Sequence, residues 1–177
     1  SEIIELEGVD LTINAERLPF TDKSLDVIIL LNVIHHITNS EKFLTECHRV
    51  LKYDGQILLI EPANTWFSRI IYKNFHHEDF DENGGWHLEK NGGRLSNANQ
   101  AIPYIIFERD LKIFKEKFPG FSLIKKHKFK PIHYVLSGGF SYEPVFNNQL
   151  FLKIIKFIEF ILYPLNNFLG LFMFIIS

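Results

Sequence analysis

Residues 26–62 decide the fold, because two continuous apolar runs flank a helical pattern there. The first run is Val27-Ile28-Ile29-Leu30-Leu31, between Asp26 and Asn32, and the second is Ile57-Leu58-Leu59-Ile60, closed by Glu61-Pro62. A short apolar run bounded by turn residues is typical of a strand covered on both faces, as in a parallel sheet. Strand, helix and strand within about 35 residues predict a βαβ unit with a right-handed crossover.

The helix between the two strands is predicted over residues 40–52. Ser40 is the expected N-cap, and Glu41 lies in the first turn, where the helix dipole favours an acid. Apolar residues recur on one helical face, namely Phe43, Leu44, Cys47, Val50 and Leu51. We expect Gly55 to end the connection by supplying a positive φ. In such units ligands bind at the carboxyl ends of the strands, here near residues 32–36 and Glu61.

Composition indicates a globular domain that does not bind nucleic acid. The 177 residues suffice for one core, and 19 basic against 21 acidic side chains give a net charge of −2. A single cysteine, Cys47, excludes a disulfide framework and a thiolate zinc site within the chain, and fits a reducing cytoplasm. Ser1-Glu2 does not open a signal peptide, and position 1 is not Met, so we expect a longer protein or a processed chain.

The flanking segments add shorter predictions. Residues 3–6 and 9–13 are candidate strands, and Pro19 keeps Leu18 out of the helical region. Helices are expected over 63–75, 107–118 and 149–162, one or two strands over 121–136, a turn at 137–139, and a last strand over 171–176. The polar stretch 76–100, with its paired glycines, is typical of a functional lid or mobile loop.

Several ordered motifs resemble class I S-adenosylmethionine (SAM)-dependent methyltransferases of the small-molecule branch. They are Leu18-Pro19-Phe20, Ser24-Leu25-Asp26-Val27, His35-His36, and Arg49-Val50-Leu51-Lys52 before a glycine turn, and they cover roughly a third of the chain. The remainder is similar to a subgroup of these enzymes, in Phe75-His76-His77-Glu78, residues 95–99, residues 107–110 and residues 136–139.

The resemblance implies an α/β fold, a Rossmann-like three-layer sandwich with a mostly parallel sheet and a terminal antiparallel strand. Residues 171–176 would be that last strand and residues 121–128 its neighbour. The chain would form a single, partial methyltransferase domain, 1–177. Within it, 1–62 would be the remainder of the SAM-binding core, 63–110 the acceptor-side helix and loop, and 111–177 the C-terminal helices and strands.

The family's glycine-rich loop, which follows its first strand, has no counterpart here. None of the ten glycines forms a Gly-x-Gly motif. We therefore expect that the first strand, its loop and its helix precede Ser1, so that the domain is N-terminally truncated and these 177 residues alone bind SAM poorly or not at all.

Five residues are candidate contacts for the cofactor, S-adenosyl-L-methionine. The resemblance places Asn14 and Ala15 at the adenine, where an amide oxygen can accept a hydrogen bond, or Asn14 simply forms a turn. Glu2 corresponds to the acid that binds the ribose hydroxyls, or is a solvated terminal residue. Asn32 and Val33 line the methionine end, or Asn32 satisfies local backbone groups.

The candidate catalytic residues are His36, His76, His77 and Glu78. A histidine with a pKa near neutrality can take a proton from the acceptor, while His35 or His36 can instead hold the loop. Residues 76–81 and His87 match no standard zinc spacing, so we expect no metal ion. Arg94, Asn97, Asn99 and Arg109 are candidates for orienting a polar or anionic acceptor, or belong to an ordered surface loop.

The predicted function is methyl transfer from SAM to the oxygen or nitrogen of a small-molecule acceptor, such as a sugar or lipid-linked hydroxyl. One alternative is an inactive fragment or pseudo-enzyme that acts as an interaction module. Another is a nicotinamide-dependent oxidoreductase, which would need the missing glycine motif. Residues 149–164 and the lysines of 125–130 are candidates for peripheral membrane contact, although burial of the helix is the default. We expect a cytoplasmic protein, with membrane association as the alternative, and the oligomeric state stays open.

Overall fold

The protein has an α/β fold in the computed structural model, which describes residues 11–88, 98–129 and 149–176. The main elements are β1 (Leu25–Leu31), α1 (Ser40–Val50), β2 (Leu51–Pro62), α2 (Trp66–Phe75), α4 (Leu111–Lys117), β3 (Lys125–Phe129), α6 (Gln149–Ile161) and β4 (Phe172–Ile176). The short elements are η1 (Ile34–His36), α3 (Ile102–Tyr104), η2 (Ile105–Arg109), η3 (Tyr163–Leu165) and α7 (Asn166–Leu169).

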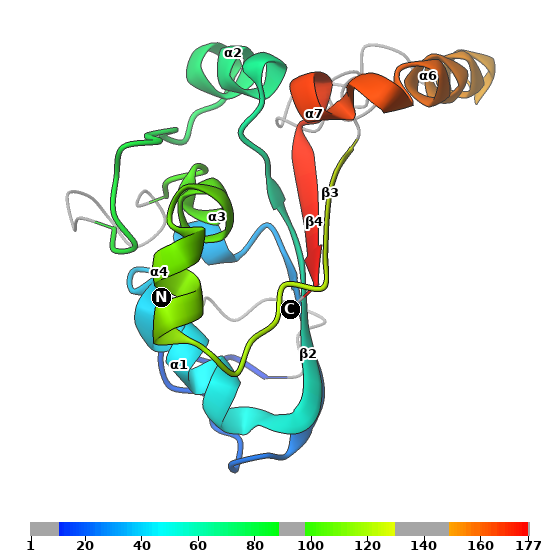
Figure 1. Ribbon diagram of the computed structural model, residues 1–177. Coiled ribbons are helices and arrows are strands. Elements are labelled where there is room, and N and C mark those ends of the chain that lie inside the picture. Colours follow the sequence, from blue (N-terminus) through cyan, green and yellow to red (C-terminus); the bar gives the residue numbers. More distant parts are fainter. Residues whose placement is uncertain (1–10, 89–97, 130–148, 177) are drawn as a thin grey trace.

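The sheet of the described residues is mixed and has the strand order β1-β2-β4-β3. β1 and β2 are parallel, with Ile28 opposite Ile57, whereas β4 runs antiparallel to both β2 and β3. This arrangement confirms the predicted α/β class, the βαβ unit and the terminal antiparallel strand with residues 125–129 as its neighbour. Figure 1 shows β4 lying between β2 and β3, although it comes last in the sequence.

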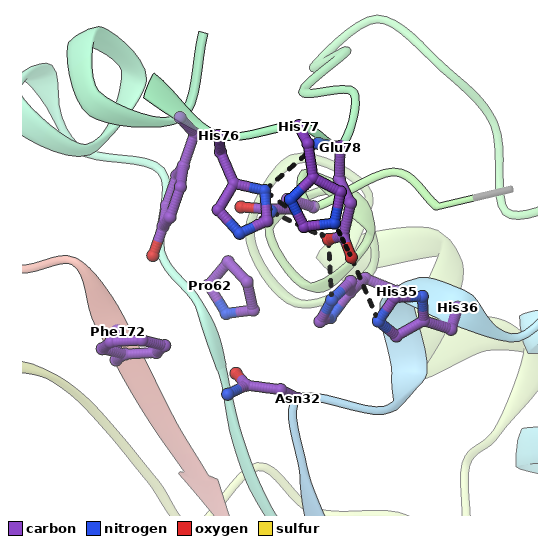
Figure 2. A pocket seen from close by; sticks show the side chains of 10 residues that line it. Asn32, His35, His36, Pro62, His76, His77, Glu78 and Phe172 are labelled. Carbon is purple, nitrogen blue, oxygen red and sulfur yellow. Dashed lines mark hydrogen bonds and ion pairs between the residues drawn. The ribbon is translucent and has the colours of Figure 1, made fainter. Parts of the chain in front are cut away.

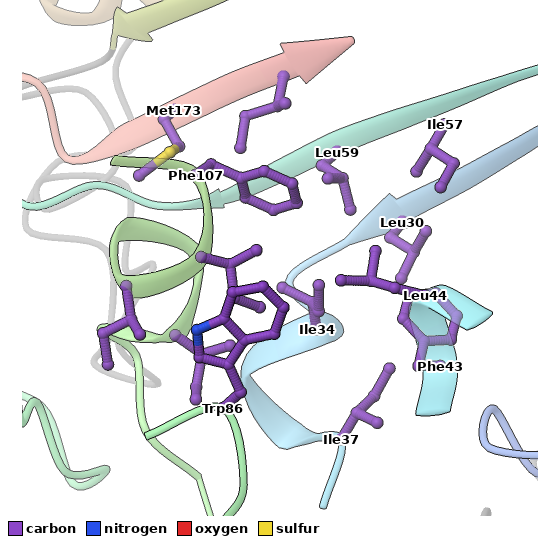
Figure 3. Close-up of a cluster of buried hydrophobic side chains, with 14 of the residues drawn as sticks. Leu30, Ile34, Ile37, Phe43, Leu44, Ile57, Leu59, Trp86, Phe107 and Met173 are labelled. Carbon is purple, nitrogen blue, oxygen red and sulfur yellow. The ribbon is translucent and has the colours of Figure 1, made fainter. Parts of the chain in front are cut away.

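The hydrophobic core lies on one face of this sheet. Leu30 from β1, Leu59 from β2 and Met173 from β4 are buried against α1 and the segment of α3, η2 and α4. Figure 3 shows Trp86 and Phe107 among these aliphatic side chains. Burial of such large apolar surfaces is the main favourable term in folding, so this face fixes how the helices sit on the sheet.

The opposite face of β1 is exposed, and the prediction that both faces are covered is wrong. Val27, Ile29 and Leu31 are 45%, 65% and 59% exposed. Successive side chains in a strand point to opposite faces, so within residues 27–31 Ile28 and Leu30 are the side chains that reach the core. Figure 1 shows α1, α3 and α4 on the same side of the sheet, and among the described residues no helix covers the other side of β1.

Two details of the βαβ unit also differ from the prediction. The N-cap of α1 is Asn39, not Ser40, because the Asn39 side chain accepts a hydrogen bond of 2.9 Å from the Lys42 amide. Gly55 lies inside β2 and does not have a left-handed φ. A Cβ there would come within 3.0 Å of Leu51 Cδ2 and Lys52 O, beside the irregular register of β1 and β2, so close approach explains this glycine.

The Leu18-Pro19-Phe20 motif forms an extended strap along α1. Arg49 donates from Nη2 to Leu18 O and from Nη1 to Phe20 O, and the Leu18 amide donates to Glu46 Oε2. Arg49 also pairs with Glu46 over 2.7 Å. A guanidinium can serve several acceptors at once, so Arg49 joins two motifs that lie some thirty residues apart.

The remaining helices start or pack differently from the prediction. α2 begins at Trp66, after a capping box of Thr65 and Ser68. It buries Ser68, Ile71 and Tyr72, while Trp66, Ile70 and Phe75 are exposed. The helix predicted over 107–118 begins earlier, with α3, and passes through the π-helical turn η2. Residues 3–6, 130–136 and 137–139 lie outside the described residues, and Leu11–Ile13 form no strand.

The described parts of the polar stretch 76–100 are tied to the core. The Leu88 amide donates to Thr38 O, and the Ser40 amide donates to Trp86 O. Trp86 is buried and donates from Nε1 to Asp110 Oδ2 over 2.9 Å. These contacts hold residues 86–88 against the core, and the functional lid or mobile loop over 76–100 stays a prediction.

α6 and the lysines of β3 also depart from the expectations. Leu150, Ile154, Phe157, Ile158, Phe160 and Ile161 of α6 are exposed. The default prediction that α6 is buried on the domain is thus wrong for most of its apolar side chains. Figure 1 shows α6 at the outer end of the molecule, beyond α7. Among the described helices, none is long and apolar enough to cross a membrane. Lys126 and Lys128 pair with Glu108, so they are not a free basic face.

Candidate active site

A cavity lies at the carboxyl ends of β1 and β2, where ligands bind in parallel α/β units. Its volume is about 210 Å³. It is lined by Asn32, His35, His36, Pro62, Tyr72, His76, His77, Glu78, Gln100 and Phe172. All four predicted catalytic residues line it, although two chain segments about forty residues apart supply them. Figure 2 shows His76 and His77 on one side of the Glu78 carboxylate and His35 and His36 on the other.

Asn32 forms the turn that carries the chain from β1 to the cavity. Its φ is 55°, in the left-handed region, which Asn tolerates better than most residues. The Asn32 amide donates to Ile60 O over 2.8 Å, so the turn remains attached to β2. Val33 is exposed and does not line the cavity, but its amide donates to Glu61 Oε1.

A buried pair of His35 and Glu61 anchors the site. His35 Nδ1 lies 2.7 Å from Glu61 Oε2, and the side chains are 3% and 0% exposed. Glu61 Oε1 accepts hydrogen bonds from the Val33 and Ile34 amides, which start η1. Sequence reasoning placed Glu61 at this edge but gave it no role. An acid that directly follows a continuous apolar strand was the pattern that could have identified it.

Glu78 is the charged centre of the cavity. Its Oε2 accepts a hydrogen bond of 2.9 Å from Gln100 Nε2 and lies 3.6 Å from His35 Nε2. Burial raises the pKa of Glu78, but the neighbouring His35, the hydrogen bond from Gln100 and the charge of His36 outweigh burial and lower it to about 2. Burial lowers the pKa of His35, but Glu61 and Glu78 outweigh it and raise the pKa to about 9. At neutral pH this site holds a protonated His35 between two carboxylates.

The pKa values of His36 and His76 are lowered, in contrast to that of His35. Burial, followed by the charge of His35, lowers the pKa of His36 below its ordinary value. Burial also lowers the pKa of His76, against the attraction of Glu78. Both rings are therefore mainly neutral at pH 7. His76 Nδ1 accepts a hydrogen bond from the Glu78 amide, and His77 is 73% exposed at the mouth.

Gln100, Tyr72 and Phe172 also line the cavity, and sequence reasoning missed them. Gln100 Nε2 contacts both Glu78 and His76, so it orients the two polar side chains. The Tyr72 hydroxyl donates to Leu171 O over 2.6 Å, which ties α2 to β4. Nothing in the spacing of these residues points to a common site, because five different segments supply the lining.

The predicted adenine contacts, Asn14 and Ala15, do not line this cavity. Asn14 Oδ1 accepts a hydrogen bond from the Glu16 amide, and Ala15 is buried. Glu16 Oε1 accepts from the Asn39 amide at the N-terminus of α1, so this turn lies at the same edge of the sheet as the cavity. Glu2 lies outside the described residues, so the structure does not place the predicted ribose contact.

The candidates for orienting the acceptor have structural contacts where they are described. Asn99 is buried, and its Oδ1 accepts from the Asp81 and Ala101 amides. Arg109 donates to Glu82 O and Gly84 O and pairs with Asp110 over 2.8 Å. Arg94 and Asn97 lie outside the described residues. Asn99 and Arg109 thus hold the loop rather than face the cavity.

Comparison with known proteins shows similarity to methyltransferases. Residues 5–59, which include β1, α1 and most of β2, match the family model of a methyltransferase domain. This match supports the predicted class I SAM-dependent methyltransferase. The motifs that first suggested this family coincide with structural features, since Arg49 holds the Leu18-Pro19-Phe20 strap and His35-His36 form η1 beside the cavity.

Curated relatives of this chain extend the similarity beyond residue 59. It is 32% identical over 127 residues to the ubiquinone/menaquinone biosynthesis C-methyltransferase UbiE of Citrifermentans bemidjiense, covering 70% of this chain and 49% of that protein. The UbiE of Rickettsia prowazekii is 30% identical over 128 residues, covering 71% and 48%. The chain spans about half the length of the curated relatives that it matches.

Solved structures show a weaker similarity. A SAM-dependent methyltransferase from Archaeoglobus fulgidus matches with a TM-score of 0.45 and 18% identity, covering 89% of this chain and 60% of that one. The α/β fold of this chain is therefore established by its own strand order and by the parallel pairing of β1 and β2.

Proposed function

We propose that this protein transfers a methyl group from SAM to a small-molecule acceptor bound in the cavity at the carboxyl ends of β1 and β2. The observation that carries the proposal is the placement of the cavity. The βαβ unit that matches the methyltransferase family presents His36 to the same space as His76, His77 and Glu78. The reaction is an in-line displacement at a sulfonium methyl, so positioning and water exclusion supply most of the rate.

His36 is the proposed proton acceptor. Its lowered pKa leaves the ring unprotonated at neutral pH, and it is partly exposed to the cavity. His76 is less suited, because its Nδ1 already accepts hydrogen bonds from the Glu78 amide and from Gln100. The negative Glu78 favours the imidazolium that forms on His36, since Glu78 Oε1 lies 3.6 Å from His36 Nε2.

The proposed SAM site lies beside the acceptor cavity. Asn32 lines the cavity at the end of β1, and the Asn14-Ala15 turn lies at the same edge of the sheet. We propose that Asn32 and Val33 contact the methionine end and that Asn14 and Ala15 contact the adenine. Glu2 remains the proposed ribose contact.

A direct test measures S-adenosylhomocysteine formation from SAM with a panel of small-molecule acceptors. His36→Gln should lower kcat by roughly 10²–10⁴-fold. His48→Gln is the matched control, because His48 lies on α1, toward the opposite edge of the sheet, and should leave turnover unchanged. The rate should fall only below pH 6.5, the ordinary histidine value, because the pKa of His36 is lowered. Equal turnover by His36→Gln and wild type would falsify the role of His36.

The acceptor atom is proposed to carry a proton that leaves during or before transfer. A hydroxyl or amine, including a sugar or lipid-linked hydroxyl, meets this condition. The relatives named as ubiquinone/menaquinone biosynthesis C-methyltransferases favour adding a quinone-type carbon acceptor to the panel. Identification of the methylated atom by mass spectrometry and NMR of the product decides between oxygen, nitrogen and carbon.

We also propose that α6 contacts a membrane surface. Its exposed apolar side chains include Ile154, Phe157 and Ile161, and Lys153 and Lys156 are exposed on an adjacent face. Co-sedimentation with vesicles that contain anionic lipid tests the contact. Ile154→Glu should abolish co-sedimentation, whereas Leu11→Glu, at an exposed apolar position outside α6, should not. Wild-type protein that stays in the supernatant contradicts the proposal.

A second candidate function is an interaction module without catalysis. The exposed face of β1 favours it, since Val27, Ile29 and Leu31 present contiguous apolar surface next to a strand edge that is unpaired among the described residues. Ile29→Lys separates the two candidates. It should disrupt an assembly of an interaction module, measured by sedimentation velocity, but leave methyl transfer in the cavity intact.

A further inference from the structure

Four imidazole rings surround the Glu78 carboxylate at distances too long for hydrogen bonds. His36 Nε2 and His77 Nε2 each lie 3.6 Å from Oε1, whereas His35 Nε2 lies 3.6 Å and His76 Nδ1 3.9 Å from Oε2. Hydrogen bonds between such groups span roughly 2.7–3.2 Å. The four imidazoles thus surround Glu78 without forming hydrogen bonds to its carboxylate.

Distances of this size suit ligands of one metal ion. Zinc bonds to histidine nitrogen and carboxylate oxygen are about 2.0–2.2 Å long, which separates two ligand atoms of a tetrahedral site by roughly 3.3–3.5 Å. His35, His36 and Glu78 can each offer one ligand atom, and these three atoms lie within 4.8 Å of one another. His35 Nε2 lies 3.6 Å from Glu78 Oε2 and His36 Nε2 lies 3.6 Å from Glu78 Oε1, so each nitrogen is close to ligand spacing from one carboxylate oxygen.

His35 is also held as a metal-binding histidine usually is. Its Nδ1 faces Glu61 Oε2 at 2.7 Å, so Nε2 points toward the cavity. Histidines that bind metals commonly donate the other ring nitrogen to a carboxylate, which fixes the tautomer and the ring orientation. Glu61 is itself fixed by the amides of Val33 and Ile34. With one proton kept on Nδ1, Nε2 can coordinate an ion once the second proton of the imidazolium is released to solvent.

A second triad, His76, His77 and Glu78, has comparable spacing but weaker support. His76 Nδ1, which faces Glu78, already accepts a hydrogen bond of 3.2 Å from the Glu78 amide and contacts Gln100. His77 is 73% exposed, and its side chain would lose much freedom on binding an ion. The triad of His35, His36 and Glu78 is the more buried and better oriented site.

We propose that His35, His36 and Glu78 bind a divalent transition-metal ion, such as Zn²⁺, with one coordination position open to the cavity. Two imidazoles and one carboxylate are suitable ligands for zinc and its neighbours in the first transition row, and three protein ligands with an open position are typical of catalytic sites. The sequence did not reveal this triad, because Glu78 lies more than forty residues from His36.

An ion at this place would alter the proposed reaction. While bound to the metal, His36 could not accept a proton. The ion would replace it by binding the acceptor atom in the open position and lowering the pKa of that atom. Metal binding itself does not depend on the proposed methyl transfer, so it can be measured without SAM or acceptor.

The test is a calorimetric titration of the tag-free, chelator-treated chain with Zn²⁺ alone. We expect one ion per chain. Glu78→Gln and His36→Gln should each weaken binding at least 100-fold, and Glu61→Gln should weaken it roughly 10–100-fold. His48→Gln is the control and should bind as wild type does. Circular dichroism and thermal melting establish that each variant is folded.

Three outcomes would overturn the assignment. The first is a folded wild-type chain that takes up neither Zn²⁺ nor Co²⁺. Alternatively, His77→Gln could abolish binding while His36→Gln retains it, which would place the ion in the other triad. Lastly, His48→Gln could weaken binding as much as Glu78→Gln, which would indicate nonspecific uptake. Methyl transfer that persists with excess chelator, together with tight Zn²⁺ binding, would leave the site in place and separate it from the reaction.

Discussion

The carboxylate of Glu61 lies 2.7 Å from His35 and accepts the two amides that begin η1. Glu61→Ala should destabilise the fold by about 3–5 kcal/mol, because it leaves a buried cationic histidine and two amides without their partner. Urea unfolding measures this free energy. Glu41→Ala is the control, since Glu41 forms a more exposed pair with Lys117 and should cost about 1 kcal/mol or less. Equal losses in both variants contradict the prediction.

Glu46 should make the strap sensitive to acid. Hydrogen bonding to Arg49 lowers the pKa of Glu46, against the effect of burial. A carboxyl with a lowered folded-state pKa contributes stability above its unfolded value, here 4.5, and loses it as the pH falls through the folded-state value. The stability difference between wild type and Glu46→Gln should therefore be largest near pH 7 and shrink below pH 4.5. A difference that is constant with pH contradicts this link, and Glu116→Gln, in an exposed pair, serves as control.

Asn32 should tolerate glycine but not a branched side chain. Its φ of 55° costs most non-glycine residues about 1–2 kcal/mol, and β-branched residues are the least suited to it. Asn32→Val should lower the thermal midpoint, whereas Asn32→Gly should leave it nearly unchanged. Calorimetric melting compares the two variants, and an Asn32→Val protein as stable as wild type would show that the turn is not strained.

SAM binding should be weak in this chain by itself. The 177 residues contain no Gly-x-Gly motif, and the outer edge of β1 is unpaired among the described residues. Calorimetric titration of these 177 residues with SAM should therefore give little heat. Tight binding by the 177 residues alone would refute this expectation. The Zn²⁺ titration is independent of it.

Local sequence patterns predicted where helices and strands form better than they predicted which faces of these elements are buried. The apolar runs of β1 and β2 and the periodicity of α1 each lie within a dozen residues, so the sequence was enough to predict them. Ile29 is exposed, contrary to the prediction. Whether it is buried depends on which segment covers that face of the sheet, and the residues of β1 do not encode this. The exposure of α6 has the same origin, since an apolar pattern predicts a buried face without specifying its partner.

The candidate site was predicted only in part. The sequence suggested that histidines of the pairs His35-His36 and His76-His77 could accept a proton, and the structure brings both pairs to one cavity. Their opposing pKa shifts required knowledge of the neighbours, because Glu61 raises that of His35 while burial lowers that of His36. Gly55 shows the same limit, since only the packed strand reveals that Leu51 and Lys52 leave no room for a Cβ.

The position of β4 between β2 and β3 has a consequence for biosynthesis. In the described sheet β3 pairs only with β4, and β4 is made after both of its neighbours. While the ribosome is still translating residues 130–170, β3 has no strand in this sheet to pair with. The core around Met173 then closes only when residues 172–176 have emerged, so we expect this half of the sheet to form later than the half made of β1 and β2.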